Sequence, residues 1–217
     1  MPIRSLLGTL FLCLVLGATG AGADAPGSVP LNAANTSLLK RLENYLDTVR
    51  TVRSRFLQVS SAGNVAEGLF EMSRPGKMRI EYDPPMPVEI IADGDWIHYH
   101  DRELKQVTSS PIRWTPAAPL LNEDIKLLNG RYIVTGLDQA KNAFIVTLTD
   151  RERLKDIGSL TLVFTDNPLA LRKWSVTDAR GIVTSVTLIS PDFSVSFDKG
   201  FFSFENPYPD ILSDENR

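Results

Sequence analysis

The sequence has 217 residues, of which 43% are hydrophobic, and this suits one globular domain with a substantial core. Its 23 Lys and Arg residues nearly balance 26 Asp and Glu residues, and they form no basic stripe, so we expect no nucleic acid partner. The single cysteine, Cys13, allows no disulfide within the chain.

Residues 1–23 have the features of a cleaved export signal peptide. Arg4 supplies the positive end, residues 6–15 are mostly apolar, and Ala21-Gly22-Ala23 offers small residues for cleavage. This apolar run is shorter than the roughly 20 residues of a membrane-spanning helix. Lipidation at Cys13 is the alternative, but the bulky pair Phe11-Leu12 precedes it, so we expect a soluble exported chain without a thiol.

Residues 24–35 are rich in Pro, Gly, Ala and Asn and predict a flexible leader before a single domain over residues 36–217. Asn35 or Thr36 is expected to cap the helix that follows. Its apolar stripe has helical spacing and consists of Leu38, Leu39, Leu42, Tyr45, Leu46 and Val49.

Short runs of alternating apolar and polar residues, separated by turn residues, predict antiparallel strands over most of the remaining chain. We expect a first strand at 53–60 and four or five strands within 67–108. Further strands are expected at 131–137, 143–149, 159–165, 170–177, 182–189 and, as a last short one, 201–204.

Residues 109–129 interrupt the strands. Thr115-Pro116 predicts a cap followed by proline in the first helical turn. A short apolar helix should follow, with Pro119 interrupting it; its apolar positions are Leu120, Leu121, Ile125 and Leu128.

These elements predict a mainly β fold of the α+β class, with about eleven strands in one curved antiparallel sheet of meander order. The apolar face of such a sheet must be covered. Closure into a barrel would cover it, and so would the two helices acting as a lid on a sheet that curls part-way round.

Arg74 is the most informative single residue. Alternation places it on the same face as Phe70 and Met72, whereas Arg79 belongs to the charged, solvent-facing side of the next strand. An unpaired buried guanidinium costs several kcal/mol, so Arg74 needs a partner. It either pairs with a carboxylate at the end of the sheet, or it lies at an apolar cavity and binds lid carbonyls or a ligand head group.

Catalytic signatures are missing from the sequence, including G-x-S-x-G, H-E-x-x-H, the Walker loop and G-x-G-x-x-G. His98 and His100 lie two apart on one strand face and could offer two metal ligands, but an outward polar face explains them more simply. We therefore expect no enzyme, no catalytic residues, no metal and no cofactor.

Several motifs occur together in a fixed order along the mature chain. They are Phe56-x-Gln58, Gly68-x-Phe70, Arg74-Pro75-Gly76-Lys77-Met78-Arg79-Ile80-Glu81-Tyr82, Pro85, Ile91-x-Asp93-Gly94, Trp96-x-x-Tyr99, Gln106-x-Thr108, Thr115-Pro116 and Phe202-x-Phe204 before Pro207. In this order the motifs resemble the outer-membrane lipoprotein carrier family, LolA. Phe202-x-Phe204 is similar to that family's last strand. Met78 departs from the aromatic residue usual in the family, and Glu205-Asn206 replaces a proline-rich exit.

The resemblance implies an unclosed β-barrel with a helical lid over an apolar cavity. It implies a soluble, monomeric periplasmic carrier that takes acylated lipoproteins from an inner-membrane ABC transporter to an outer-membrane receptor. Arg74 would be the lid latch. The lid would include Leu38, Leu42, Leu120 and Leu121. The acyl-chain cavity would be lined by Phe56, Phe70, Met72, Met78, Ile80, Tyr82, Val88 and Ile90.

Two other functions stay open on the residues alone. The same fold could carry another envelope lipid or a glycolipid. If the residues assigned to the cavity are instead an ordinary filled core, the chain could be an interaction domain for another envelope protein.

Overall fold

The computed structural model describes residues 27–115, 117–152 and 158–208. The expected signal peptide lies outside these residues. Within them the chain forms one eleven-stranded antiparallel sheet, two α-helices and a short 3-10 helix. In the described part of the chain, no helix is both long and apolar enough to cross a membrane.

The helices are Ala33–Thr48 (α1), Ile112–Trp114 (the 3-10 helix η1) and Ala118–Leu121 (α2). The strands are Thr51–Ser60 (β1), Val65–Ser73 (β2), Lys77–Tyr82 (β3), Val88–Asp93 (β4), Trp96–Asp101 (β5), Gln106–Pro111 (β6), Tyr132–Ala140 (β7), Ala143–Asp150 (β8), Ser159–Thr165 (β9), Ala170–Thr177 (β10) and Val183–Asp192 (β11).

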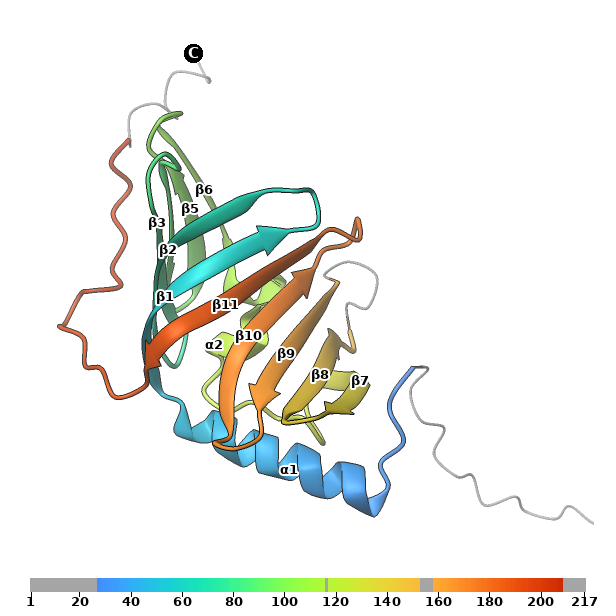
Figure 1. The fold of residues 1–217 in the computed structure, drawn as a ribbon. Helices are drawn as coiled ribbons and strands as arrows, with labels where there is room; N and C mark the ends of the chain where they lie inside the picture. The colour runs from blue at the N-terminus through green and yellow to red at the C-terminus, as the bar shows by residue number, and fades with distance from the viewer. Residues whose placement is uncertain (1–26, 116, 153–157, 209–217) are drawn as a thin grey trace, which may run out of the picture.

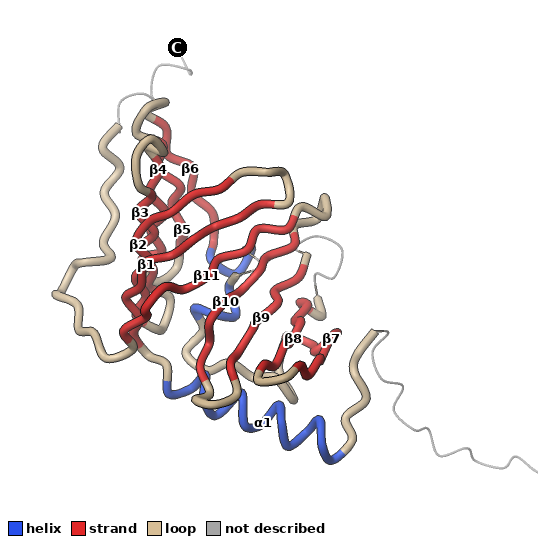
Figure 2. The backbone as a smooth tube through the Cα atoms, viewed as in Figure 1, coloured by secondary structure: helices blue, strands red, loops and turns tan. Residues whose placement is uncertain are grey.

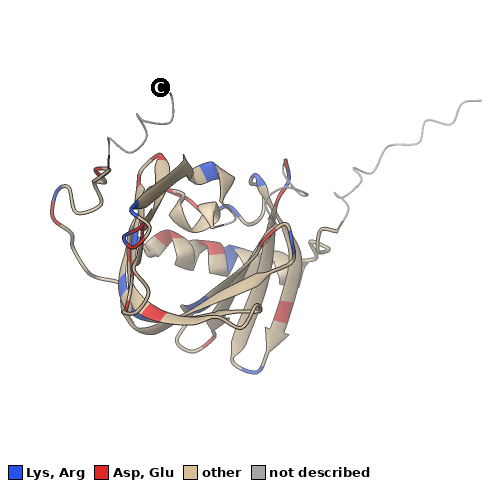
Figure 3. Ribbon diagram, turned by 90° about the horizontal axis from the view of Figure 1, so that it is seen from above, with Lys and Arg blue, Asp and Glu red and all other residues tan. Residues whose placement is uncertain are grey.

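The strands lie in the order β6-β5-β4-β3-β2-β1-β11-β10-β9-β8-β7. Strands β1 to β6 form a first meander, β7 to β11 form a second, and the pairing of β1 with β11 joins them. Strands β6 and β7 are the two edges, so the sheet curls without closing (Figures 1 and 2). The expected single curved antiparallel sheet is confirmed, and helices rather than closure cover its concave face (Figure 3).

Helix α1 begins earlier than the sequence pattern indicated. Its N-cap is Asn32, whose Oδ1 accepts a hydrogen bond from the Asn35 backbone N–H at 2.9 Å. The expected caps, Asn35 and Thr36, are therefore wrong, and the leader expected to reach residue 35 ends at the cap. Ala33-Ala34 are good helix formers directly after an Asn, which is why the helix includes them.

Helix α2 is shorter than expected. It ends at Leu121, so Ile125 and Leu128 lie in irregular chain instead of a helix. Asn122 and Asp124 favour departure from a helix, because their side chains compete for backbone hydrogen bonds or prefer caps. Thr115 ends η1, its N–H donating to the Ile112 carbonyl at 3.0 Å, and does not cap α2; Pro116 lies outside the described residues.

The expected strand at 201–204 does not form. Residues 193–208, called here the C-terminal segment, run as irregular chain along the outer face of the first meander (Figure 1). Contacts of aromatic rings, and not the hydrogen bonds of a strand ladder, hold this segment on the sheet. Phe204 stacks on His98 with centroids 4.4 Å apart, and the Arg79 guanidinium lies 5.6 Å from the centroid of Phe201.

The C-terminal segment covers a charged face that alternation alone had placed in solvent. Glu89 is 6% exposed and lies 2.7 Å from Arg79 and 3.0 Å from Arg102. His100, also buried, has Nδ1 3.6 Å from the same carboxylate. Each buried charge on this face thus has an opposite charge beside it, as burial requires.

Candidate functional site

A small closed cavity lies between the concave face of the sheet and the helices. Its volume is about 10 Å³, close to the minimum that holds one water molecule. α1, α2, and strands of both meanders contribute to its wall. The lining residues are Leu46, Val49, Val52, Phe70, Met72, Arg74, Leu120, Leu171, Trp174 and Leu188. Arg74 is the only charged side chain among them, and the structure shows the site closed.

The residues expected to line an acyl-chain cavity fall into three groups. Phe70 and Met72 line the cavity directly. Phe56 and Met78 are buried in the same apolar core but away from the cavity wall, while Ile80, Tyr82 and Ile90 are partly buried against that core. Val88 is buried outside the core cluster.

Trp174 is a wall residue that the sequence did not single out. It comes from β10 in the second meander, and its ring centroid lies 4.9 Å from that of Phe70 on β2. A Trp in an alternating strand was a visible signal for a core position. The contact of Trp174 with Phe70 could not be predicted from the sequence. The two residues meet because the pairing of β1 with β11 brings the two meanders together.

The Phe56 ring packs closely over Gly68 of the neighbouring strand. It pairs across the sheet with Gly68, and a Cβ built on Gly68 would lie 2.8 Å from the Phe56 ring. The ring therefore occupies space that any larger residue would take. Tyr82 meets Phe56 edge-on at 5.5 Å and donates a hydrogen bond to Gln58 at 2.8 Å.

The cover over the cavity consists of α1 and residues 118–128, called here the lid. Of the leucines expected in it, Leu42, Leu120 and Leu121 are buried and Leu38 is partly buried. All four pack against or within the apolar core.

Two acidic side chains of α1 fasten the irregular part of the lid to the helix. The backbone N–H of Leu127 donates to Glu43 Oε2 at 2.9 Å. The backbone N–H of Ile125 donates to Asp47 Oδ1 at 3.3 Å. The chain at 122–128 lacks ladder partners of its own, so these carboxylates satisfy donors that would otherwise be unpaired. The two parts of the lid are thereby linked.

The Arg74–Gly76 turn between β2 and β3 touches both parts of the lid. Arg74 Nη2 donates to the Leu46 carbonyl in the last turn of α1, where a positive charge also favours the helix dipole. The Gly76 backbone N–H donates to the Leu121 carbonyl at 2.8 Å. Gly76 has φ +72°, and an added Cβ would lie 2.5 Å from the Gly94 carbonyl oxygen, so the position requires glycine.

Arg74 is held at the cavity by a backbone carbonyl. It is 8% exposed, and within the described residues it forms no ion pair with a carboxylate. Burial and, to a smaller extent, the positive charge of Arg50 lower the pKa of Arg74 to about 10, against the opposing effect of Asp47 and Asp124. The guanidinium thus stays charged at neutral pH. Its Nε and Nη1 atoms are buried and have no hydrogen-bond partner within the part of the chain that the structure describes.

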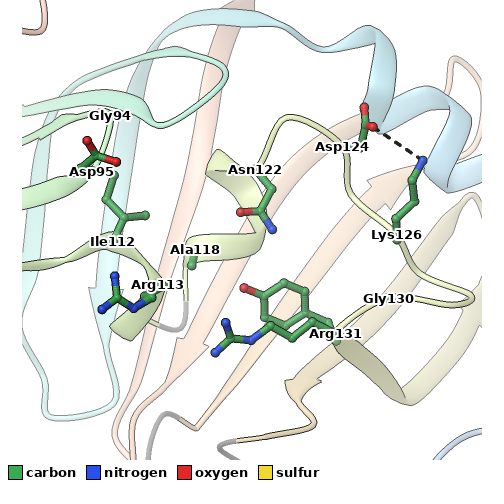
Figure 4. A pocket seen from close by; sticks show the side chains of 11 residues that line it. Gly94, Asp95, Ile112, Arg113, Ala118, Asn122, Asp124, Lys126, Gly130 and Arg131 are labelled. Atoms are coloured by element: carbon green, nitrogen blue, oxygen red, sulfur yellow. Dashed lines mark ion pairs between the residues drawn. The ribbon is translucent and has the colours of Figure 1, made fainter.

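A second, open pocket of about 400 Å³ lies between the β4–β5 turn and the chain that leads from β6 to β7. Figure 4 shows its charged lining, which includes Arg113, Lys126, Arg131, Asp95 and Asp124. Lys126 and Asp124 form an ion pair at 4.0 Å. This pocket suits polar groups, and hydrocarbon would gain little there.

The two histidines lie on the outer face of the sheet and have separate partners. His98 has Nδ1 2.8 Å from Ser109 Oγ and Nε2 3.1 Å from Asp93 Oδ2. His100 Nε2 is 3.4 Å from the Tyr208 hydroxyl. Among the described residues, no group of three or more His, Cys, Asp or Glu side chains is placed to hold a metal ion.

Comparison with known proteins matches the sequence to a family. The family described as outer membrane lipoprotein carrier protein LolA matches residues 47–205. The outer-membrane lipoprotein carrier protein of Halorhodospira halophila is 34% identical over 185 residues, which is 82% of this chain and 86% of that protein. The protein of the same name from Chromohalobacter salexigens is 29% identical over 204 residues, or 89% and 92% of the two chains.

Among solved structures, the LolA superfamily protein NE2245 of Nitrosomonas europaea superposes with a TM-score of 0.41 at 11% identity. The superposition covers 75% of this chain and 96% of that one. The family match spans most of the sequence and, with the Halorhodospira relative above 30% identity, fixes the assignment. The chain belongs to the family of outer membrane lipoprotein carrier proteins, LolA.

Proposed function

We propose that this chain is a soluble, monomeric periplasmic carrier that binds the acyl chains of lipoproteins between the concave face and the lid. It receives them from an inner-membrane ABC transporter and delivers them to an outer-membrane receptor. The observation that carries the proposal is an apolar wall drawn from both meanders and covered by a lid that a few polar contacts fasten to the sheet. In this proposal the chain works by binding and needs no catalytic residue or cofactor.

The cavity must enlarge before cargo enters. A volume of about 10 Å³ does not accommodate an acyl chain, so the lid has to move away from the β2–β3 turn. Arg74 and Gly76 then lose their contacts with the Leu46 and Leu121 carbonyls. Arg74 is the proposed latch, and the leucines of the lid are the surface that cargo displaces.

The free energies allow both capture and release. Burying roughly 8–10 methylenes of an acyl chain contributes about 6–8 kcal/mol. Displacing the lid exposes leucines that now pack in the core, at about 1.5–3 kcal/mol for each side chain that becomes fully exposed. These two free energies are of similar size. Replacement of the lid leucines by the acyl chain on the same apolar wall therefore changes the total free energy little. Such a balance suits a carrier that hands its cargo on.

The proposal is tested by native mass spectrometry of the mature chain with a diacylglyceryl lipopeptide and with the same peptide lacking acyl groups. We expect a one-to-one complex with the acylated peptide only. A Met72→Glu variant should lose that complex, because the new carboxylate would be buried beside the cargo in an apolar wall. Val65→Glu, at an exposed position of the same strand β2, is the matched control, since it adds the same charge outside the wall.

Failure of the wild-type chain to bind either peptide would contradict lipoprotein carriage. Purification of the chain from cells with a free glycolipid bound, in place of acylated protein, would instead identify it as a carrier of another envelope lipid.

A further inference from the structure

We propose that Arg74 recognises the carbonyl oxygens of a bound acyl group, so that the cavity prefers ester- or amide-linked chains over hydrocarbon lacking a carbonyl. This inference rests on the proposed function of lipid carriage and adds a specificity-determining residue to it.

The first observation is that Arg74 has hydrogen-bond donors that no described residue accepts from. A guanidinium carries N–H groups on all three nitrogens. Nη2 is engaged by the Leu46 carbonyl, but Nε and Nη1 are buried and have no partner. Buried donors are rarely left unpaired in proteins, and each one without a partner raises the free energy of the folded state. A ligand that brings acceptors to these atoms would recover that free energy.

The second observation is the setting of these donors. Arg74 lines the cavity together with nine apolar residues, including Leu120 and Trp174. Arg74 is therefore the one charged donor that this wall offers to a polar atom of the cargo. A pocket that hydrogen-bonds a group of its substrate rejects an analogue that lacks the group, because the donors of the protein then remain unpaired. A charged donor in an apolar wall strengthens this discrimination.

The third observation is the match to the chemistry of acyl groups. A chain joined to glycerol or to an amine carries its carbonyl oxygen next to the first methylene, where apolar and polar parts meet. Arg74 has the same arrangement on the protein side, with Phe70 and Met72 preceding it on the same apolar face of the hairpin. The hydrocarbon would lie on these side chains while the carbonyl oxygen faces Nε and Nη1.

The test compares two lipopeptides that differ only in linkage. One carries two hexadecanoyl esters on its glyceryl group, and the other carries two hexadecyl ethers, which have the same chains without carbonyls. We expect the wild-type chain to bind the ester probe about tenfold more tightly. Arg74→Met should bind both probes equally, and Arg74→Lys, which keeps a charge but loses the planar fork, should retain part of the preference.

A control variant separates carbonyl recognition from loosening of the lid. Glu43→Ala removes the acceptor for the Leu127 N–H and weakens the lid, but it leaves Arg74 unchanged. Its affinity for the two probes should change in parallel, so the ratio between them should stay near the wild-type ratio. Thermal melting of each variant confirms that it is folded before its affinities are compared.

A free fatty acid offers similar acceptors, and hexadecanoate as a third probe distinguishes it from a lipoprotein. Weaker binding of hexadecanoate than of the ester probe supports recognition of an acylated protein, and tighter binding overturns it. Equal wild-type affinity for the ester and ether probes would overturn the inference while leaving lipoprotein carriage intact. An Arg74→Met variant that still prefers the ester would overturn it as well. Binding of neither lipopeptide would instead remove the proposed function itself.

Discussion

The two faces of the β2–β3 hairpin each carry an arginine, and the buried Arg74 and the partly buried Arg79 are satisfied in opposite ways. On the outer face, Arg79 lies 2.7 Å from the carboxylate of Glu89, beneath Phe201 of the C-terminal segment. On the inner face, Arg74 has a single backbone carbonyl of the lid and two unpartnered nitrogens. Paired charges lie beneath the outer cover, whereas hydrogen bonds from Arg74 and Gly76 to backbone carbonyls join the inner cover to the hairpin. This difference suits a permanent cover on one side and a movable lid on the other.

The largest effect should come from reversing the outer charge. Arg79→Glu would leave Glu89 buried beside a second carboxylate, with only Arg102 and His100 to compensate. Breaking a buried ion pair in this way is expected to cost about 3 kcal/mol. Urea denaturation measures the loss. A change below about 1 kcal/mol would show that the outer charges are not a fixed part of the fold.

A smaller loss of stability is expected from Gly76→Ala, which strains the turn that holds the inner lid. The φ of +72° disfavours alanine, and its Cβ would approach the Gly94 carbonyl oxygen. We expect a cost of about 2 kcal/mol. Hydrogen exchange should also accelerate in residues 118–121, because the Leu121 carbonyl loses a well-placed donor. Unchanged exchange in these residues would mean that the turn does not fasten the lid.

Phe204→Ala tests whether the C-terminal segment is independent of the lid. The variant removes the ring stacked on His98, which is partly exposed, so we expect a cost of about 1 kcal/mol. Lipopeptide affinity should match that of the wild type when measured by fluorescence anisotropy. Weaker binding would show that the two covers are coupled through the sheet.

The smallest effect on stability is expected for Arg74→Leu. A leucine suits the apolar wall, and the lost hydrogen bond is offset by removing two unpartnered donors, so the change should stay within about 1 kcal/mol. Function should respond more strongly than stability. With the ether-linked probe, which has no carbonyl for Arg74 to bind, the variant should load cargo but release it slowly, since the closed empty state loses its latch while the apolar wall remains. A transfer assay to receptor vesicles checks this, and wild-type release would show that Arg74 is not a latch.

Local patterns in the sequence predicted the strands well, because alternation and turn residues are local properties. The strands at 159–165 and 170–177 have the expected bounds, since Asp166-Asn167-Pro168 marks the turn between them. The predicted helix through residue 128 failed for a different reason. Ile125 is buried, but its backbone is held by Asp47 of α1, a contact that no local pattern contains.

The site was foreseeable only in part. Alternation placed Phe70, Met72 and Arg74 on one face, and all three line the cavity. Alternation could not predict that Trp174 and Leu188 line the same cavity, because the register of β1 on β11 brings together residues far apart in the chain. Alternation also assigns a residue to a face without saying what covers that face. The charged side of β3 was therefore expected in solvent, although the C-terminal segment lies over it.

The pairing of β1 with β11 has a consequence for the order in which the protein is built. A chain exported from its N-terminus delivers β1 early and β11 among the last strands, yet the register pairs Gln58 with Val186. Contacts of such sequence separation form late, because a long loop must close first. The first meander can pair internally as soon as it emerges, but the cavity wall lacks Leu188 until the second half arrives. A half-translocated chain therefore lacks part of the wall that we propose binds lipid, and we expect binding only when the sheet is complete.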